Sequence, residues 1–377
     1  MQDAINKKHI LGIDALRFAS AVMVMLFHFG FLLGVNANGV IGAVNQRQTS
    51  YPELYDFTYF GWVGVQTFFV ISGFVIAFSG ERASLFSFFA SRVVRLGPGV
   101  WICAPITIAI LLAVGLPVGV AEIRGLRNSM AFIPWEPWVD GVYWTLGIEI
   151  AFYSLIWLLI GFGRFMAIRY VAIFIGVIST IYWLPQSPLA AMVSAVPQRG
   201  LQLLLVQHGM FFALGVFLRL QFVKAEGRNI GWCALFLVGG CLQIAGENEH
   251  VNVAFGKRYS VLVACVIWLG SVALLVVSVR FNHLVHRAPY WFLKMLKSAG
   301  LMTFPLYLLH QIGGAAVLGA LVKNGMGRWS ALTLVCLGSI LAAWLVASCL
   351  EPAVQRVVKT MLMRGKGRLI IPAGRPS

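Results

Sequence analysis

The sequence predicts an all-α integral membrane protein in which about ten transmembrane helices form a single bundle. Only 11% of the residues are charged and 59% are hydrophobic, whereas a soluble domain carries about 25% charged residues. The mean hydropathy is +0.84. The apolar residues form long runs separated by short basic or Trp-rich loops, and a helix needs about 20 such residues to cross the hydrocarbon core.

The apolar runs locate the predicted spans along the chain. They lie at about 12–34, 59–79, 100–119, 143–163, 167–184, 203–220, 231–246, 260–279, 301–321 and 329–350. The run at 231–246 is the weakest, because it is short and contains Gly239, Gly240 and Gln243. The longest loops, 36–58, 80–99, 120–142 and 280–300, are too short for a soluble domain. We therefore expect one transmembrane domain over residues 1–355 and a basic tail over 356–377.

The distribution of charge predicts the orientation. With the N-terminus inside, 21 of the 29 Lys and Arg residues fall on the inner side, and the positive-inside rule then places both termini in the cytoplasm. The net charge of +16 is thus explained by topology, and we expect the bilayer, not nucleic acid, as partner. The amphipathic segment Val354 to Met363 in the tail is expected to lie on the anionic inner leaflet.

The cysteine pattern indicates neither a disulfide framework nor a metal site. All six Cys residues lie in or at the edge of predicted spans, without a C-x-x-C pair. Buried thiols that pack as small hydrophobic groups are the simplest interpretation. We expect no permanently bound cofactor.

Ionisable residues inside spans are informative, because each costs about 2.5–3.5 kcal/mol on insertion scales. The first span carries Asp14, Arg17 and His28. Eleven residues at ~100° each return Arg17 and His28 to nearly the same helix face, roughly 16 Å apart. Arg17 then lies near the inner interface, where snorkelling would also explain it. His28 lies deep in the outer half, as a reactive or a hydrogen-bonded structural imidazole.

Glu149 is a carboxylate at a depth that matches His28. It lies six residues into the fourth span, about 9 Å by helical rise. A Glu beside His28 would fix its tautomer and raise its basicity, so the two are a hypothetical catalytic pair. An ion pair between Glu149 and another buried cation is the alternative.

Two further groups have a functional and a structural interpretation. Arg92 and Arg95 are spaced i, i+3, so both are expected on one side of a short helix, where they would bind phosphate or simply anchor the chain inside. His310 lies near the middle of the ninth span and is a second catalytic group or a packing residue.

Ser72 and Trp144 are weaker candidates. Ser72 precedes Gly73 in the middle of a span, and such a small-residue pair usually marks close helix packing, not a nucleophile. Trp144 belongs to a group of outer Trp residues that is typical of an interfacial belt. Aromatic faces beside acids would also suit a sugar.

Several of these residues fall in five short segments that follow one another along the chain. They are Arg17-x10-His28 after Gly-Ile-Asp14-Ala-Leu, Phe68-Phe-Val-Ile-Ser72-Gly-Phe74, Arg92-x-x-Arg95 with Pro98, Trp144-Thr-Leu-Gly-Ile-Glu149-Ile-Ala-Phe-Tyr153, and Phe304-Pro-Leu-Tyr307-Leu-Leu-His310. In this order they resemble the acyltransferase-3 family of membrane O-acyltransferases. The fourth matches the pattern Trp-Ser-Leu-x-x-Glu-x-x-Phe-Tyr, with Thr145 in place of the usual Ser.

The resemblance implies a membrane enzyme that transfers an acyl group, usually acetyl, from acyl-CoA. It implies an acceptor such as exopolysaccharide, O-antigen, Nod factor or another surface glycan or lipid-linked saccharide, and a location in the bacterial inner membrane. His28 and Glu149 are then expected to be catalytic, with His28 as general base or acyl carrier. Arg17, Arg92 and Arg95 are expected to bind acyl-CoA, with Asp14, Ser72, Trp144, Tyr153, Tyr307 and His310 as secondary site residues. A transporter or flippase for lipid-linked saccharides, using the same buried charges, is the alternative.

Overall fold

The structure is a computed structural model that describes residues 9–80, 83–223 and 225–369. Every regular element among these residues is helical. The helices are α2 Leu11–Leu26, α3 Leu33–Val35, α4 Val40–Val44, α5 Tyr55–Thr58, α6 Val63–Ser79, α7 Leu85–Ala113, α8 Val120–Met130, α9 Trp144–Gly161, α10 Ile168–Tyr182, α11 Pro188–Met192, α12 Gln198–Leu203, α13 Gly209–Val223, α14 Gly227–Phe255, α15 Val261–Arg280, α16 Asn282–Val285, α17 Tyr290–Leu309, α18 Ile312–Lys323, α19 Arg328–Leu345 and α20 Glu351–Leu369. Short 3₁₀ turns and two π-helical turns, Phe27–Leu32 and Val346–Leu350, connect some of them.

The long helices account for the predicted spans. In the described part of the chain, eight helical segments are long and apolar enough to cross a membrane, and a ninth is a pair of helices with a bend. They are Leu11–Val35, Pro52–Ala77, Leu85–Ala113, Gly141–Gly161, Phe165–Tyr182, Gly227–Phe255, Val261–Arg280, Arg328–Arg364 and the pair Tyr290–Leu309 with Ile312–Lys323. The remaining predicted span, 203–220, corresponds to α13, which has only 15 residues. The all-α, polytopic membrane fold is thus confirmed.

Three predicted boundaries were wrong. The stretch 80–99 is not a loop, because α7 begins at Leu85 and runs unbroken for 29 residues. The span judged weakest is also a 29-residue helix, α14. Its glycines are sites of close packing, since a Cβ on Gly240 would lie 2.3 Å from the ring of Trp268. Beyond residue 350 the chain continues directly into α20, whose helix extends the span instead of starting a separate segment.

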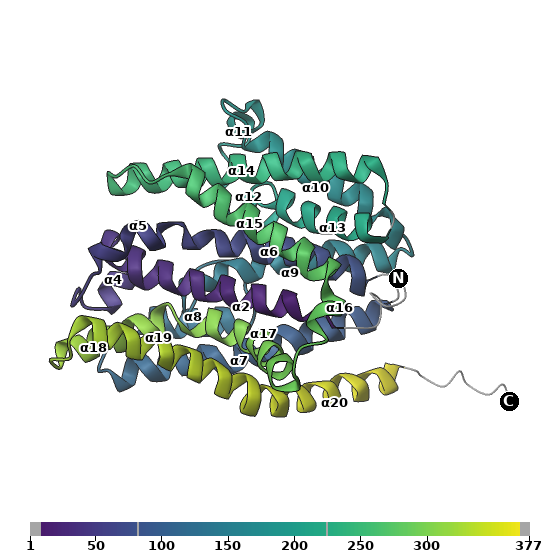
Figure 1. Cartoon of the computed structure of the whole chain (residues 1–377). Helices are drawn as coiled ribbons and strands as arrows, with labels where there is room; N and C mark the ends of the chain where they lie inside the picture. The colour runs from purple at the N-terminus through teal and green to yellow at the C-terminus, as the bar shows by residue number, and fades with distance from the viewer. Residues whose placement is uncertain (1–8, 81–82, 224, 370–377) are drawn as a thin grey trace.

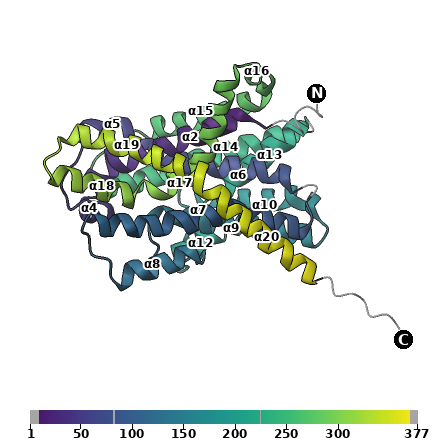
Figure 2. The ribbon, with the colours of Figure 1, turned by 90° about the horizontal axis from the view of Figure 1, so that it is seen from below.

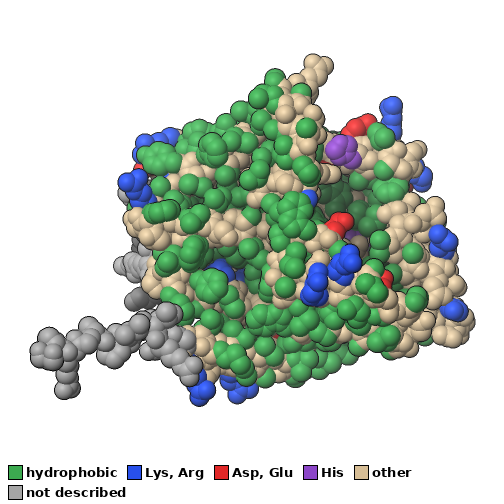
Figure 3. Space-filling view, turned by 180° about the vertical axis from the view of Figure 1, so that it is seen from behind, with side chains coloured by type: hydrophobic (Ala, Val, Ile, Leu, Met, Phe, Trp, Pro, Cys, Tyr) green, Lys and Arg blue, Asp and Glu red, His purple; other side chains and the backbone are tan. Residues whose placement is uncertain are grey.

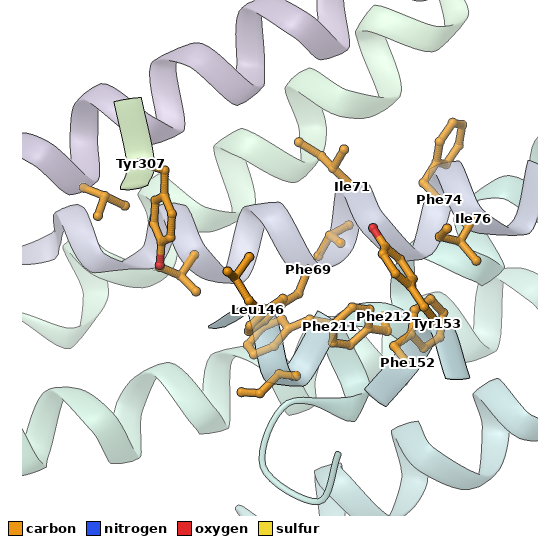
Figure 4. Packing of buried hydrophobic residues seen from close by; sticks show 14 of the residues in the cluster. Phe69, Ile71, Phe74, Ile76, Leu146, Phe152, Tyr153, Phe211, Phe212 and Tyr307 are labelled. Carbon is orange, nitrogen blue, oxygen red and sulfur yellow. The ribbon is translucent and has the colours of Figure 1, made fainter. Parts of the chain in front are cut away.

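Helix α13 lies at the centre of one half of the bundle, where it packs against α6, α10 and α14. Its residues from Gly209 to Phe217 are buried. Two glycines allow its backbone to approach α6: a Cβ on Gly73 would lie 2.1 Å from the carbonyl oxygen of Phe212, and one on Gly215 would lie 2.1 Å from that of Val70. The rings of Phe69, Phe152, Phe211 and Phe212 fill the space around this contact (Figure 4). The close-packing interpretation of Ser72-Gly73 is therefore confirmed for the glycine.

In the other half of the bundle, α2 packs along α17, and α17 in turn contacts α7 and α19. The long helices run roughly alongside one another (Figure 1). The N-terminal end of α2 and the C-terminal end of α20 lie at the same end of the bundle. Seen from below, α20 crosses α7 (Figure 2). That the N-terminal end of α2 and the C-terminal end of α20 share one side agrees with the predicted topology, while the cytoplasmic location of both chain ends stays a prediction.

The surface of the bundle suits a bilayer. Hydrophobic side chains cover most of the middle of the face in Figure 3, and most Lys and Arg side chains lie toward its two ends. Large apolar residues such as Phe174, Leu274 and Leu337 are more than half exposed. Because a soluble domain rarely exposes so much contiguous apolar surface, we assign this belt to lipid.

Candidate functional site

The centre of the fold holds a pair of buried histidines from opposite ends of the chain. His28 lies in the π-helical turn Phe27–Leu32 that interrupts the first span, and such turns are frequent at functional sites. His310 lies at the end of α17, where the ninth span bends by 70° before α18. Nδ1 of His28 is 2.9 Å from Nε2 of His310, and His310 is 0% exposed.

The hydrogen bonds around this pair determine which nitrogen is free to act as a base. Nδ1 of His310 lies 3.0 Å from the carbonyl oxygen of Leu306, and a carbonyl only accepts, so this nitrogen carries the proton. Nε2 of neutral His310 is then the acceptor, and Nδ1–H of His28 is the donor. Nε2 of His28 is left with the lone pair. The Leu306 carbonyl thus orients His310, and His310 in turn orients the imidazole of His28.

Glu149 does not pair with His28, contrary to the hypothesis drawn from their matching depths. Its Oε1 accepts a hydrogen bond of 2.8 Å from the Ser72 hydroxyl and a second from the Tyr153 hydroxyl. The reason is the order of the helices: α9 packs on α6 and α7, while α2 packs chiefly on α17 and α6. Equal depth in the membrane therefore did not mean adjacency.

A cavity of about 400 Å³ lies beside these groups. Its polar lining consists of His9, Asp14, Arg17, Ser72, Ser91, Arg95, Thr145, Glu149, Lys297, Thr303, Tyr307, Glu351 and Gln355. Six of the residues expected at the site, Asp14, Arg17, Ser72, Arg95, Glu149 and Tyr307, are thus brought together from α2, α6, α7, α9 and α17. Lys297 and Glu351 also line the cavity and were not anticipated, because Lys297 reads as an ordinary inner-side cation and Glu351 as the end of a span.

The cations of this cavity are open to an anionic ligand. In the described parts of the chain, no carboxylate lies within 4.0 Å of the guanidinium of Arg17 or Arg95. Asp14, the nearest acid along the helix, instead accepts a hydrogen bond from His9, which raises the pKa of His9 above its usual value. Arg17 is half-buried and Arg95 is exposed at the cavity, so both guanidinium groups are accessible from it, and they favour a phosphate-bearing ligand.

The two histidines are not among the residues that line this cavity. Tyr307, at its wall, lies with its ring centroid 6.0 Å from that of His310, and its hydroxyl accepts a hydrogen bond of 3.2 Å from Thr145. Tyr307 therefore separates the polar cavity from the His28–His310 pair. Trp144 lies elsewhere, with its ring 5.5 Å from that of buried His208.

Arg92 and Arg95 do not face the same space, although the i, i+3 spacing predicted that they would. Arg95 lines the polar cavity, whereas Arg92 lies 5.3 Å from the ring centroids of both Phe88 and Tyr153 and lines a separate apolar groove. Three residues advance a helix by about 300°, not a full turn. The ring of Tyr153 lies beside Arg92, and its hydroxyl donates to Glu149, which lines the cavity of Arg95.

Asp140 joins the segment that leads into α9 to the start of α18, a structural role that the sequence did not indicate. It is 1% exposed. Its Oδ1 accepts a hydrogen bond of 3.1 Å from the amide of Val142, at the start of the helical segment leading into α9, and its Oδ2 accepts one of 2.8 Å from the amide of Ile312, at the start of α18. One carboxylate thus caps two helices and holds the bend next to His310. An outer loop acid offered no signal of this, because its second partner is 172 residues away.

Comparison with known proteins gives a family for this arrangement. The acyltransferase domain of the acyltransferase-3 family matches residues 10–348. The exopolysaccharide production protein ExoZ of Rhizobium meliloti (strain 1021) is 33% identical over 106 residues, which are 25% of this chain and 33% of ExoZ. The match thus spans about a third of that relative's length. No solved structure matches the chain.

The family match covers residues 10–348, and so includes both histidines, Asp140 and most of the lining of the polar cavity, but not His9, Glu351 and Gln355. It favours an enzyme over the transporter considered from the sequence. The chain belongs to the acyltransferase-3 family and is a membrane acyltransferase.

Proposed function

We propose that this acyltransferase moves an acyl group, in the first instance acetyl, from acyl-CoA to a hydroxyl group of a cell-surface carbohydrate in the bacterial inner membrane. The observation that carries the proposal is the buried His28–His310 pair near a cavity with two arginines, Arg17 and Arg95, that have no carboxylate partner among the described residues. The name of the relative from Rhizobium meliloti, an exopolysaccharide production protein, supports a polysaccharide acceptor.

The polar cavity suits the donor. Arg17 and Arg95 have no carboxylate partner within 4.0 Å in the described residues, and Lys297 adds a third cation to the lining. Guanidinium groups bind phosphate with two hydrogen bonds. In this arrangement the phosphates of acyl-CoA would lie at Arg17 and Arg95, with the thioester directed along the cavity toward Tyr307.

His28 would act as the general base. Its Nε2 takes the proton of the acceptor hydroxyl as the oxygen attacks the thioester carbonyl, and the C–S bond then breaks while the departing sulfur takes up that proton. Such a base contributes about 10²–10⁴ in rate. His310 holds His28 in the required tautomer. In the acyl-carrier version, Nε2 itself attacks the thioester carbonyl and the C–S bond breaks to release the CoA thiolate. The acceptor hydroxyl then attacks the acyl-imidazole, the C–N bond breaks to return His28, and the hydroxyl proton passes to the thiolate.

The Ser72–Glu149 hydrogen bond inside the cavity favours a second candidate for the acyl carrier. Ser72 Oγ is 2.8 Å from a carboxylate oxygen that would accept its proton. Incubation of purified protein with radiolabelled acetyl-CoA, without acceptor, separates the three versions. Label on Ser72 that disappears in Ser72→Ala supports the serine route, label on His28 supports the acyl-imidazole, and full transfer without a labelled protein supports the base.

The function itself is tested by mass spectrometry of surface glycans from cells with and without this chain, together with consumption of acetyl-CoA by the purified protein. We expect O-acetylated glycan only in the cells that contain it, and no acetylation with His28→Ala at equal membrane abundance. Wild-type acetylation by the His28→Ala variant would overturn the role of His28. Absence of any acetyl-CoA consumption with a range of glycans would overturn the proposed reaction.

A further inference from the structure

A second cavity, separate from the polar one, lies between α7 and α9. It measures about 380 Å³ and is almost entirely apolar, with walls that include Phe88, Val93, Trp101 and Ile150. Both helices are candidate membrane spans, and Phe89 and Trp157 at its border are 49% and 37% exposed. The groove therefore opens toward the lipid and not toward water.

Among the described residues that line this groove, one is a cation, Arg92. Its guanidinium lies 5.3 Å from the ring centroids of Phe88 and Tyr153, and its Nε donates to the Ser91 hydroxyl. Within the described residues, no carboxylate lies within 4.0 Å of it. Arg92 is seven residues, about 10 Å by helical rise, from the start of α7. The guanidinium is therefore available to an anion, and in a lipid-facing groove on the inner side of the predicted topology the anion at hand is a lipid phosphate.

Tyr153 connects this groove to the chemistry. Its ring forms part of the groove wall beside Arg92, while its hydroxyl donates to Glu149 in the polar cavity. Tyr153 is thus the partition between the two spaces. A lipid whose phosphate is bound at Arg92 carries its head group next to the polar cavity, and its hydrocarbon chain has an apolar path along α7 from Arg92 to Trp101, about 14 Å by helical rise.

We propose that the groove between α7 and α9 binds the lipid anchor of a lipid-linked saccharide acceptor, with Arg92 on the lipid phosphate. This rests on the proposed function and specifies its acceptor. This assignment gives the two arginines of α7 different ligands. Arg95, in the polar cavity, binds the phosphates of the donor, and Arg92, in the apolar groove, binds the phosphate of the acceptor. A nucleotide would not fit the groove, which offers almost no polar lining beyond Arg92, Tyr153 and Ser154.

Binding is tested with the purified full chain in uncharged maltoside detergent. The probe is hexadecyl phosphate with a photoreactive diazirine at the end of the chain, and the control probe is hexadecanol with the same label. We expect cross-links to peptides of α7 and α9. Arg92→Gln should lower labelling by the phosphate at least about tenfold, because a hydrogen bond to a charged group is lost, and should leave labelling by the alcohol unchanged. Arg92→Lys should keep part of the effect, and Arg95→Gln should have none.

Three results would overturn the site: equal phosphate labelling of wild type and Arg92→Gln, cross-links confined to other helices, or an equal loss with Arg95→Gln. The thermal unfolding midpoint of each variant in detergent controls for folding. Arg92→Lys, which keeps the charge and most of the length, keeps the comparison valid if Arg92→Gln proves unstable.

A transfer assay distinguishes an acceptor from a structural lipid. The same oligosaccharide is offered free and linked to hexadecyl phosphate, with acetyl-CoA as donor. We expect Arg92→Lys and Arg92→Gln to raise KM for the lipid-linked acceptor only. Loss of binding without a change in that KM would mean that the groove holds an ordinary phospholipid, which overturns the acceptor assignment. If wild type acetylates neither form, the proposed function fails, and phosphate labelling that depends on Arg92 still establishes the lipid-phosphate site.

Discussion

His28 donates a hydrogen bond from Nδ1 to Nε2 of His310 across 2.9 Å, although the two residues are 282 positions apart in the chain. The contact forms because α17 packs along α2 and bends immediately after His310. It gives His28 an orienting partner that is neutral and itself held by a backbone carbonyl. Four predictions follow from this site and from the packing that supports it.

The first prediction concerns the orienting role of His310. Replacement by Gln places an amide oxygen where Nε2 accepts from His28, whereas replacement by Ala removes the acceptor. His310→Gln should therefore retain clearly more activity than His310→Ala, which should lose about 10²–10⁴ in kcat, the usual contribution of a positioned base. The measurement is steady-state acetyl transfer at saturating acetyl-CoA. Equal activity of the two variants would show that His310 only fills space.

The second prediction concerns donor binding. Arg17→Ala and Arg95→Ala should each weaken binding of acetyl-CoA about tenfold or more, because each removes a charge-assisted hydrogen bond worth about 1.5–3 kcal/mol. Arg92→Ala should leave this affinity unchanged, since Arg92 faces the apolar groove. Titration calorimetry on the purified protein measures the affinities. Arg164→Ala, at an exposed loop position, is the matched control for general loss of positive charge.

The third prediction uses the pH dependence of Asp140. Burial raises the pKa of Asp140 from 3.8 to about 7. Between these values the folded protein binds more protons at this site than the unfolded chain, so stability falls as the pH rises through that window and levels off above it. Unfolding midpoints in detergent should show this decline for wild type and a flatter profile for Asp140→Asn.

Comparison of the two profiles isolates the contribution of Asp140 from that of other titrating groups. The variant and the wild type should be most similar near pH 5, where wild-type Asp140 is protonated and, like Asn, offers one carbonyl oxygen as acceptor. Parallel profiles across the whole range would contradict the assignment.

The fourth prediction concerns the contact between α6 and α13. A Cβ at residue 73 would lie 2.1 Å from the carbonyl oxygen of Phe212, so Gly73→Ala must push the two backbones apart at a cost of about 1–3 kcal/mol or more. Gly270→Ala is the control, because nothing lies within 4 Å of a Cβ at that position in α15. The unfolding midpoint should fall clearly for the first and hold or rise for the second. A similar response of both variants would mean that an added methyl group at residue 73 does not force α6 and α13 apart.

Much of the fold was determined by the sequence alone. The apolar runs and the low share of charged residues predict an all-helical membrane bundle, because lipid leaves few other solutions for a backbone that must satisfy its own hydrogen bonds. Nine of the ten predicted spans correspond to helices or a bent pair long enough to cross, and the tenth to the shorter α13. The ordered motifs around His28, Glu149 and His310 also predict the family that the comparison shows.

Only the tertiary structure decided which of these residues are partners. Helical rise and phase locate a residue in depth and direction on its own helix, but not which helices are neighbours, so His28 was assigned to Glu149 when His310 is its partner. The same limit applies to Arg92 and Arg95, which line different cavities, with Tyr153 of α9 beside Arg92. It applies most to Asp140, whose capping of α18 depends on a contact between distant segments. Pairing follows from helix packing, and packing depends on side chains far apart in the chain.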